Sequence, residues 1–276
     1  MSIMMSSPSG PGESSLDRPH SARIWNYWLG GRDYYPADKE AGDAMARIIP
    51  GVVDSARADR AFLGRCVRHL VVERGVRQFL DIGAGLPTAG NTHEIAQRLA
   101  PESRVVYMDN DPLVLAHAQS LLIGTPQGAA RYVEADLRHP DGVLERAAET
   151  LDLTRPVALM LLGVLNHITD DAEAGRLVRH LVEAVPRGSY LAIAHPTDEV
   201  RGDVVHEAMW RYMKRGGTPT VARDRTRLAR FFEGLELLEP GVVPCAHWRP
   251  DPSAPSASPE FATVCAVARK PARTRR

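Results

Sequence analysis

The sequence predicts an α/β fold, in which a helical extension precedes a doubly wound, mostly parallel sheet of seven strands. Five short β-rich runs alternate with amphipathic segments, which is typical of a parallel sheet covered by helices on both faces. The Pro-rich link 244–260 is too short for a crossover helix, so we expect the last strand to return antiparallel. The expected strands are 78–82, 104–108, 131–135, 157–162, 190–194, 235–243 and 261–268.

The chain before the first strand divides into two parts of different composition. Residues 1–15 consist largely of Ser, Gly and Pro and are expected to form a disordered tail. Residues 16–75 carry apolar side chains at helical spacing, interrupted at Gly30-Gly31 and at Pro50-Gly51, so we expect helices there. We therefore expect a tail (1–15), a helical extension that could serve as a lid (16–75) and a ligand-binding sheet domain (76–270).

Charge and cysteine content exclude several classes of function. The 34 basic and 34 acidic residues balance, so the chain has no overall attraction to nucleic acid or to an anionic membrane. Its longest apolar run, 157–165, is too short to span a bilayer. Cys66, Cys245 and Cys265 form no C-x-x-C pattern, so we expect free thiols in a reducing cytoplasm and no metal site.

An aspartate stands at the end of each of the first three expected strands. These are Asp81, Asp109 and Asp136, separated by one strand–helix unit each. Ligands of open parallel sheets bind beyond the carboxyl ends of the strands, where the strand order reverses. Three carboxylates at that edge suit a ligand rich in hydroxyl groups and N–H donors.

The first strand continues into a glycine-rich loop, Asp81-Ile82-Gly83-Ala84-Gly85. Glycines there let the backbone turn tightly and approach a ligand closely. A nicotinamide-binding loop would carry Gly or Ala where this chain has Thr88, and Asp81 would repel its pyrophosphate. The same carboxylate would attract an ammonium group, and D-x-G-x-G is the pattern of S-adenosylmethionine (SAM) binding.

Longer strings of the sequence resemble one family. Ser21-Ala22-Arg23 with Leu29-Gly30-Gly31, FLDIGAGLPTAGN and VVYMDNDPLVLAHA are similar to bacterial S-adenosyl methyltransferases long catalogued as a domain of unknown function. The resemblance covers about residues 17–269. It implies the class I methyltransferase, Rossmann-like fold and SAM as cofactor, but no substrate. The chain departs from the family's usual sequence at two places. It has Trp25-Asn26-Tyr27 where the family usually has Tyr-Asp-Tyr, and Asp33-Tyr34-Tyr35 where the family usually has Asp-Asn-Phe or Asp-Asn-Tyr.

The resemblance also implies which residues bind the cofactor, all of them in the loops after the first four strands. Asp81 would hold the ammonium group, Asp109 the ribose hydroxyls, and Asp136 the adenine edge. The full set is Asp81, Gly83, Ala84, Gly85, Asp109, Asn110, Asp136, Leu137, Gly163 and Val164.

Candidate catalytic residues follow the fourth and fifth strands. Methyl transfer is an in-line displacement that requires alignment, and it needs a base only if the acceptor must lose a proton. His167, Asn166 and His195 are the candidates, although His167 could equally cap or lie on the surface and His195 could be structural. Arg57 and Arg60, which could contact an acidic substrate, are expected mainly on a solvated helix face.

The segment 25–35 gathers five aromatic residues around a Gly-Gly turn. We expect this turn to close over the cofactor, with Tyr27 and Tyr34 facing the ligand and Arg32 and Asp33 beside them. The alternative is that the helix docks by its aromatic face and only braces the fold.

These observations predict a SAM-dependent methyltransferase. We expect a small-molecule acceptor, because the chain has no basic stripe and no appended recognition domain. The alternatives are a non-catalytic sensor of SAM or S-adenosylhomocysteine (SAH) and an NAD(P)-dependent oxidoreductase. The acceptor and the oligomeric state stay open.

Overall fold

The computed structural model describes residues 17–88, 90–111, 114–116, 124–251 and 263–272. An eight-stranded sheet has the order β3-β2-β1-β4-β5-β8-β6, and β7 also pairs with β8. The expected tail (1–15) lies outside the described residues. The strands are β1 (Gln78–Ile82), β2 (Arg104–Asp109), β3 (Ala129–Glu134), β4 (Ala158–Leu162), β5 (Tyr190–Pro196), β6 (Glu236–Leu237), β7 (Val243–Pro244) and β8 (Thr263–Arg269).

The sheet confirms the predicted fold class. Strands β1 to β5 pair in parallel, and the strand order reverses between β1 and β4. As expected, β8 runs antiparallel to β5. The count of seven strands is wrong by one, because the expected strand 235–243 is divided into β6 and β7. Between them the N–H of Gly241 donates to the carbonyl of Leu238, and Pro240 has no N–H for a ladder.

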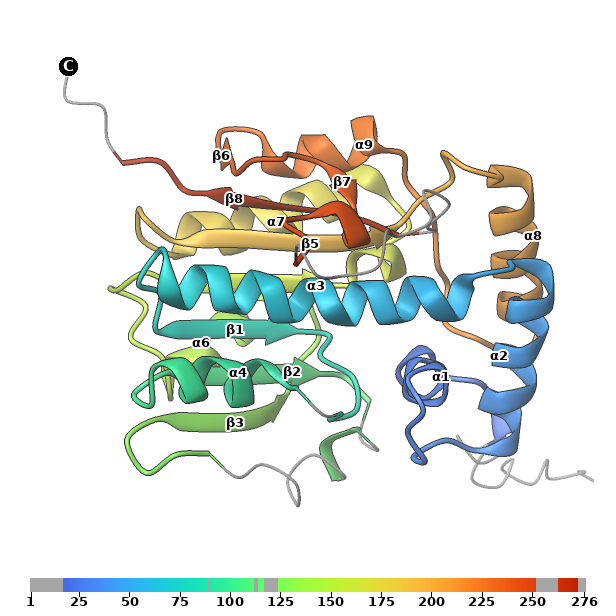
Figure 1. The fold of residues 1–276 in the computed structure, drawn as a ribbon, viewed down its shortest axis with the longest axis horizontal. Helices are drawn as coiled ribbons and strands as arrows, with labels where there is room; N and C mark the ends of the chain where they lie inside the picture. The colour runs from blue at the N-terminus through green and yellow to red at the C-terminus, as the bar shows by residue number, and fades with distance from the viewer. Residues whose placement is uncertain (1–16, 89, 112–113, 117–123, 252–262, 273–276) are drawn as a thin grey trace, which may run out of the picture.

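Helices cover both faces of the sheet (Figure 1). Helices α3 and α4 bury one apolar cluster against it, and α6 and α7 bury another on the opposite face. Helix α3 therefore belongs to a sheet-covering layer, while the division of the chain into independent units stays a prediction. The helices are α1 (Ser21–Trp28), α2 (Pro36–Ile48), α3 (Val52–Val72), α4 (Thr92–Leu99), α6 (Pro140–Ala148), α7 (Asp171–Ala184), α8 (Gly202–Lys214) and α9 (Arg225–Ala229).

A third group of helices lies beyond the carboxyl ends of β1 and β2. Figure 1 shows α1, α2 and α8 gathered there, at the right of the view. With the start of α3 they form one apolar cluster, which consists of Ile24, Trp28, Ala41, Val52, Ala56 and Tyr212. This packing places the start of α1 over the edge of the sheet where the site is expected. No helix in the described part of the chain combines the length and apolar composition needed to cross a bilayer.

Candidate active site

The loop after β1 is held in shape by its glycines and by backbone hydrogen bonds to β2. Gly83 and Gly85 have φ angles of 73° and 64°, which side chains rarely tolerate. The N–H groups of Gly83 and Ala84 donate to the carbonyl of Met108 at 2.7 and 3.1 Å. A Cβ at Gly83 would lie 2.5 Å from the Cβ of Val164. Position 83 therefore requires glycine, because its φ angle is positive and because a side chain would clash with Val164.

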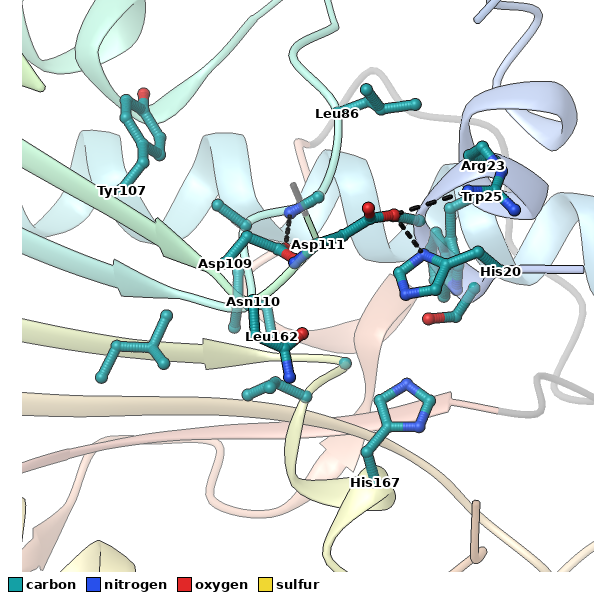
Figure 2. Close-up of a pocket in the computed structure, with 18 of the residues that line it drawn as sticks. His20, Arg23, Trp25, Leu86, Tyr107, Asp109, Asn110, Asp111, Leu162 and His167 are labelled. Atoms are coloured by element: carbon teal, nitrogen blue, oxygen red, sulfur yellow. Dashed lines mark hydrogen bonds and ion pairs between the residues drawn. The ribbon is translucent and has the colours of Figure 1, made fainter. Parts of the chain in front are cut away.

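All ten residues expected to bind the cofactor line one cavity of about 480 Å³, here called the cofactor cavity. It lies at the carboxyl ends of β1, β2 and β4, and the loop after β3 completes its rim. Figure 2 shows Asp109 and Asn110 on one side of it, with the ring of His167 opposite. The structure therefore brings these residues together, while their contacts with a cofactor stay predictions.

Burial raises the pKa of two of the three aspartates above the ordinary value for this side chain. Asp81 is 4% exposed and accepts a hydrogen bond from the Thr92 hydroxyl at 2.7 Å, and burial raises its pKa to about 6. Burial also raises the pKa of Asp109, although the N–H of Gly85 donates to it at 2.9 Å. Asp136 lies at the rim, where the Asn110 amide donates to it at 3.4 Å. A cationic ligand would offset the cost of these buried negative charges.

Arg60 faces the site, and the prediction of a solvated position for it is wrong. Its guanidinium donates to the carbonyl of Thr88 at 3.4 Å and to the side chain of Asn91 at 2.9 Å, and it lines the cofactor cavity. Arg57, one turn earlier on α3, is 65% exposed and pairs with Asp54, as expected. Helical periodicity alone does not show that α3 turns Arg60 toward the loop after β1.

The start of α1 contributes residues that the sequence did not single out individually. His20 and Arg23 lie 3.2 and 3.5 Å from the carboxylate of Asp111, across the cavity mouth (Figure 2). Arg23 also forms a buried ion pair with Asp38 of α2 at 2.7 Å. The Ser21-Ala22-Arg23 string used for the family resemblance was the signal for this segment.

The structure places the expected lid residues away from the cavity. The Tyr27 hydroxyl donates to Asp43 of α2 at 2.7 Å, and its ring packs on Tyr34 with centroids 4.9 Å apart. Arg32 is exposed, and the N–H of Asp33 donates to Asn26. Tyr27 and Tyr34 are not among the described residues that line the cavity, so their closure over a bound ligand stays a prediction. Successive side chains of α1 point in different directions, and Trp25, not Tyr27, lines the cavity.

The three candidate catalytic residues have different surroundings. His167 lines the cofactor cavity, and its Nδ1 lies 3.0 Å from the carbonyl of Pro219, so that Nδ1 carries the proton when the ring is neutral. Asn166 and His195 are buried outside that cavity. His195 Nε2 accepts from the Arg223 guanidinium at 2.8 Å, and burial lowers its pKa to about 3. This occupied lone pair makes His195 unsuitable as a base and favours its structural interpretation.

Comparison with known proteins identifies the family. A family model described as S-adenosyl methyltransferase matches residues 11–271. The crystal structure of a DUF574 family protein from Streptomyces avermitilis is 48% identical, covers 93% of this chain and 99% of its own, and has a TM-score of 0.88. A protein from Thermobifida fusca, provisionally described as a methyltransferase, is 37% identical over 94% of this chain and 97% of its own, with a TM-score of 0.86.

More distant structures share the fold. The magnesium protoporphyrin IX methyltransferase of Synechocystis PCC 6803, solved with bound SAH, is 16% identical over 83% of this chain and 93% of its own, with a TM-score of 0.50. Comparison with curated proteins gives no significant match. The family match decides against the nicotinamide-dependent alternative. The chain belongs to the S-adenosyl methyltransferase family, and as a member it is an enzyme whose cofactor is S-adenosylmethionine.

Proposed function

We propose that this enzyme transfers the methyl group of SAM to a small-molecule acceptor, with SAM bound in the cofactor cavity. The observation that carries the proposal is the charge pattern around the glycine loop. Asp81 and Arg60 both contact the segment that leads from β1 into α4, one through Thr92 and the other through Thr88 and Asn91. An anion and a cation at one end of the cavity match the zwitterionic methionine end of SAM.

Each further part of SAM has a matching group along the cavity. The Asp81 carboxylate would accept from the ammonium group, and Arg60 would donate to the carboxylate. The two Asp109 oxygens each accept one backbone N–H, from Gly85 and from Asp111. A carboxylate has about four acceptor sites, so Asp109 retains capacity for the ribose hydroxyls.

The remaining cofactor contacts follow from the same placement. Asn110, Asp136 and Leu137 would surround the adenine, and Gly163 and Val164 would border the sulfonium. For the displacement itself, the enzyme must align the acceptor with the methyl group and exclude water. The packing of α1 over the strand ends supports both tasks.

Two features support a small acceptor and a cytoplasmic enzyme. The balanced charge of the chain offers no general attraction to a nucleic acid substrate. Cys66, Cys245 and Cys265 are buried free thiols, which suits a reducing compartment.

The test is titration calorimetry of the full chain with SAH, using two arginines of the same helix. Arg60→Met should weaken binding by about tenfold or more, because it removes charge-assisted hydrogen bonds to the ligand carboxylate. Arg57→Met should leave the affinity unchanged, because Arg57 lies on the exposed face. Equal affinities of the two variants would refute this placement of the methionine end. Transfer of labelled methyl from SAM into a metabolite extract would then report an acceptor.

A further inference from the structure

A second cavity of about 100 Å³ adjoins the cofactor cavity. It lies among α1, α2, α3 and α8 and is lined mainly by apolar side chains, among them Ile24, Trp28, Met45, Ile49, Val205 and Met209. The two cavities meet at a junction, which we define by the residues that line both of them. The junction residues are Ser21, Trp25, Asp59, Gly163 and His167.

The position of the junction suits the acceptor. Gly163 lies where the cofactor placement above puts the sulfonium, so the methyl group would point toward the second cavity. An apolar cavity of about 150 Å³ can hold a benzene ring. The second cavity together with the open junction therefore has room for a single ring.

Asp59 is the acidic group at the junction. It lies on α3 and is 6% exposed, and among the described residues its hydrogen-bond partner is the Cys245 thiol at 3.7 Å. Burial raises the pKa of Asp59 to about 7, against the lowering effect of the adjacent Arg60. At neutral pH this carboxyl is therefore divided between its acidic and basic forms, as an efficient general base requires.

Among the other ionisable groups that line the two cavities, Asp81 also titrates near neutrality, with a pKa of about 6. The groups closer to the second cavity titrate elsewhere. Burial raises the pKa of Cys245 well above that of an ordinary thiol, and it also raises the pKa of Tyr212, which lines the second cavity. His195 is neutral, as described above. His167 is the competing base, because its Nε2 remains available, although burial lowers its pKa.

The second cavity also contains a buried acceptor. The Oδ1 atom of Asn166 is buried without a hydrogen-bond partner in the described part of the chain, while its Nδ2 donates to Thr220 at 3.0 Å. A carboxamide oxygen can only accept hydrogen bonds. Leaving such an atom unpaired is costly, so it favours a ligand that carries an O–H or N–H donor in addition to the hydroxyl that donates to Asp59.

We propose, on the basis of the function proposed above, that the second cavity binds the methyl acceptor, a single-ring apolar molecule with a hydroxyl group, and that Asp59 takes the hydroxyl proton. The hydroxyl oxygen attacks the methyl carbon, so that an O–C bond forms while the C–S bond of the sulfonium breaks. The O–H proton passes to the Asp59 carboxylate. SAH leaves as a neutral thioether, the positive and negative charges cancel, and Asp59 later releases its proton to water.

The first test measures binding of p-cresol to the SAH-loaded full chain by calorimetry at pH 6 and pH 8. We expect p-cresol to bind about tenfold more tightly at pH 8, because ionised Asp59 is the stronger hydrogen-bond acceptor. Toluene, which has no hydroxyl group, should bind more weakly and without pH dependence. Asp59→Asn should abolish the pH dependence for p-cresol, and His167→Gln should retain it.

The outcomes separate this inference from the proposed function. Failure of SAH to bind would contradict the proposed function itself. Normal SAH binding without p-cresol binding would overturn the acceptor class, and loss of the pH dependence in His167→Gln but not in Asp59→Asn would overturn the role of Asp59. With SAM and p-cresol, Asp59→Asn should lower the kcat for labelled methyl transfer by about 100-fold or more while leaving SAH affinity unchanged. An unchanged kcat would also overturn that role.

Discussion

Replacing Asp38 should both destabilise the protein and weaken cofactor binding. The Asp38 side chain is fully buried on α2, where it accepts the N–H of His20 at 2.8 Å, the Nε–H of Arg23 at 2.7 Å and the N–H of Tyr35 at 2.8 Å. This one carboxylate therefore ties the segment before α1, α1 itself and the start of α2 together. Because His20 and Arg23 line the cofactor cavity, the same contacts shape the mouth of the site.

The magnitude follows from what Asp38→Ala leaves behind. Removing one partner of a buried ion pair costs about 3–5 kcal/mol, since Arg23, 4% exposed, would remain buried with the more distant carboxylate of Asp111 at 3.5 Å and the Arg18 carbonyl at 2.7 Å. Two backbone N–H groups would also lose their acceptor, at about 1–3 kcal/mol each. These costs overlap, so we expect the free energy of unfolding to fall by at least about 3 kcal/mol.

Asp43→Ala, on the same helix, is the matched control. Asp43 pairs with Lys39 on the surface, where the two side chains are 35% and 49% exposed, and it also accepts a hydrogen bond from the Tyr27 hydroxyl. Such pairs contribute about 1 kcal/mol or less. Urea denaturation followed by tryptophan fluorescence should separate the two variants, and SAH calorimetry should show a loss of affinity for Asp38→Ala alone. Similar unfolding free energies for both variants would refute the account of Asp38 as the tie between these segments.

Three further predictions concern the site. Gly83→Ala should lower the unfolding free energy by about 1–3 kcal/mol, because of its positive φ and the clash with Val164, and a Gly83→Ala/Val164→Gly double variant should recover part of the loss in a thermal melt. Asp109→Ala should weaken SAH binding by tenfold or more in calorimetry, and an unchanged affinity would place the ribose elsewhere. Asp59→Asn should match the wild type in stability at pH 4 and exceed it at pH 8. A carboxyl whose pKa rises from 3.8 to about 7 on folding costs up to about 4 kcal/mol of stability as pH rises through this range, so a pH-independent difference in urea denaturation would contradict the buried acid.

The sheet and the cofactor edge could be predicted because local patterns determine them. Each β-rich run is followed by one helical crossover, which identifies the run as a strand of a parallel sheet. The aspartate after the run marks the end of the sheet at which that strand finishes. Asp81 and Asp109 needed no knowledge of distant contacts, because parallel strands bring their carboxyl ends together.

The side-chain contacts of the N-terminal helices could not be predicted in the same way. A helix turns by about 100° per residue, so the side chains of Trp25 and Tyr27 point about 160° apart, and composition does not show which of them faces the site. Two acidic partners of Arg23 are Asp38 and Asp111, which lie far from each other in the sequence. Asp59 gave no signal at all, because its burial results from the packing of α3 against Cys245.

The place of β8 in the sheet has a consequence for how the protein is made. All seven of its residues pair with β5, between that strand and β6, although β8 follows every other strand in the chain. Until residues 263–269 leave the ribosome, β5 presents a row of unpaired N–H and C=O groups along an apolar strand, and such edges recruit strands from other molecules. Nascent chains that stall before residue 263 should therefore associate with one another or depend on chaperones, even though every residue assigned to the cofactor has by then been synthesised.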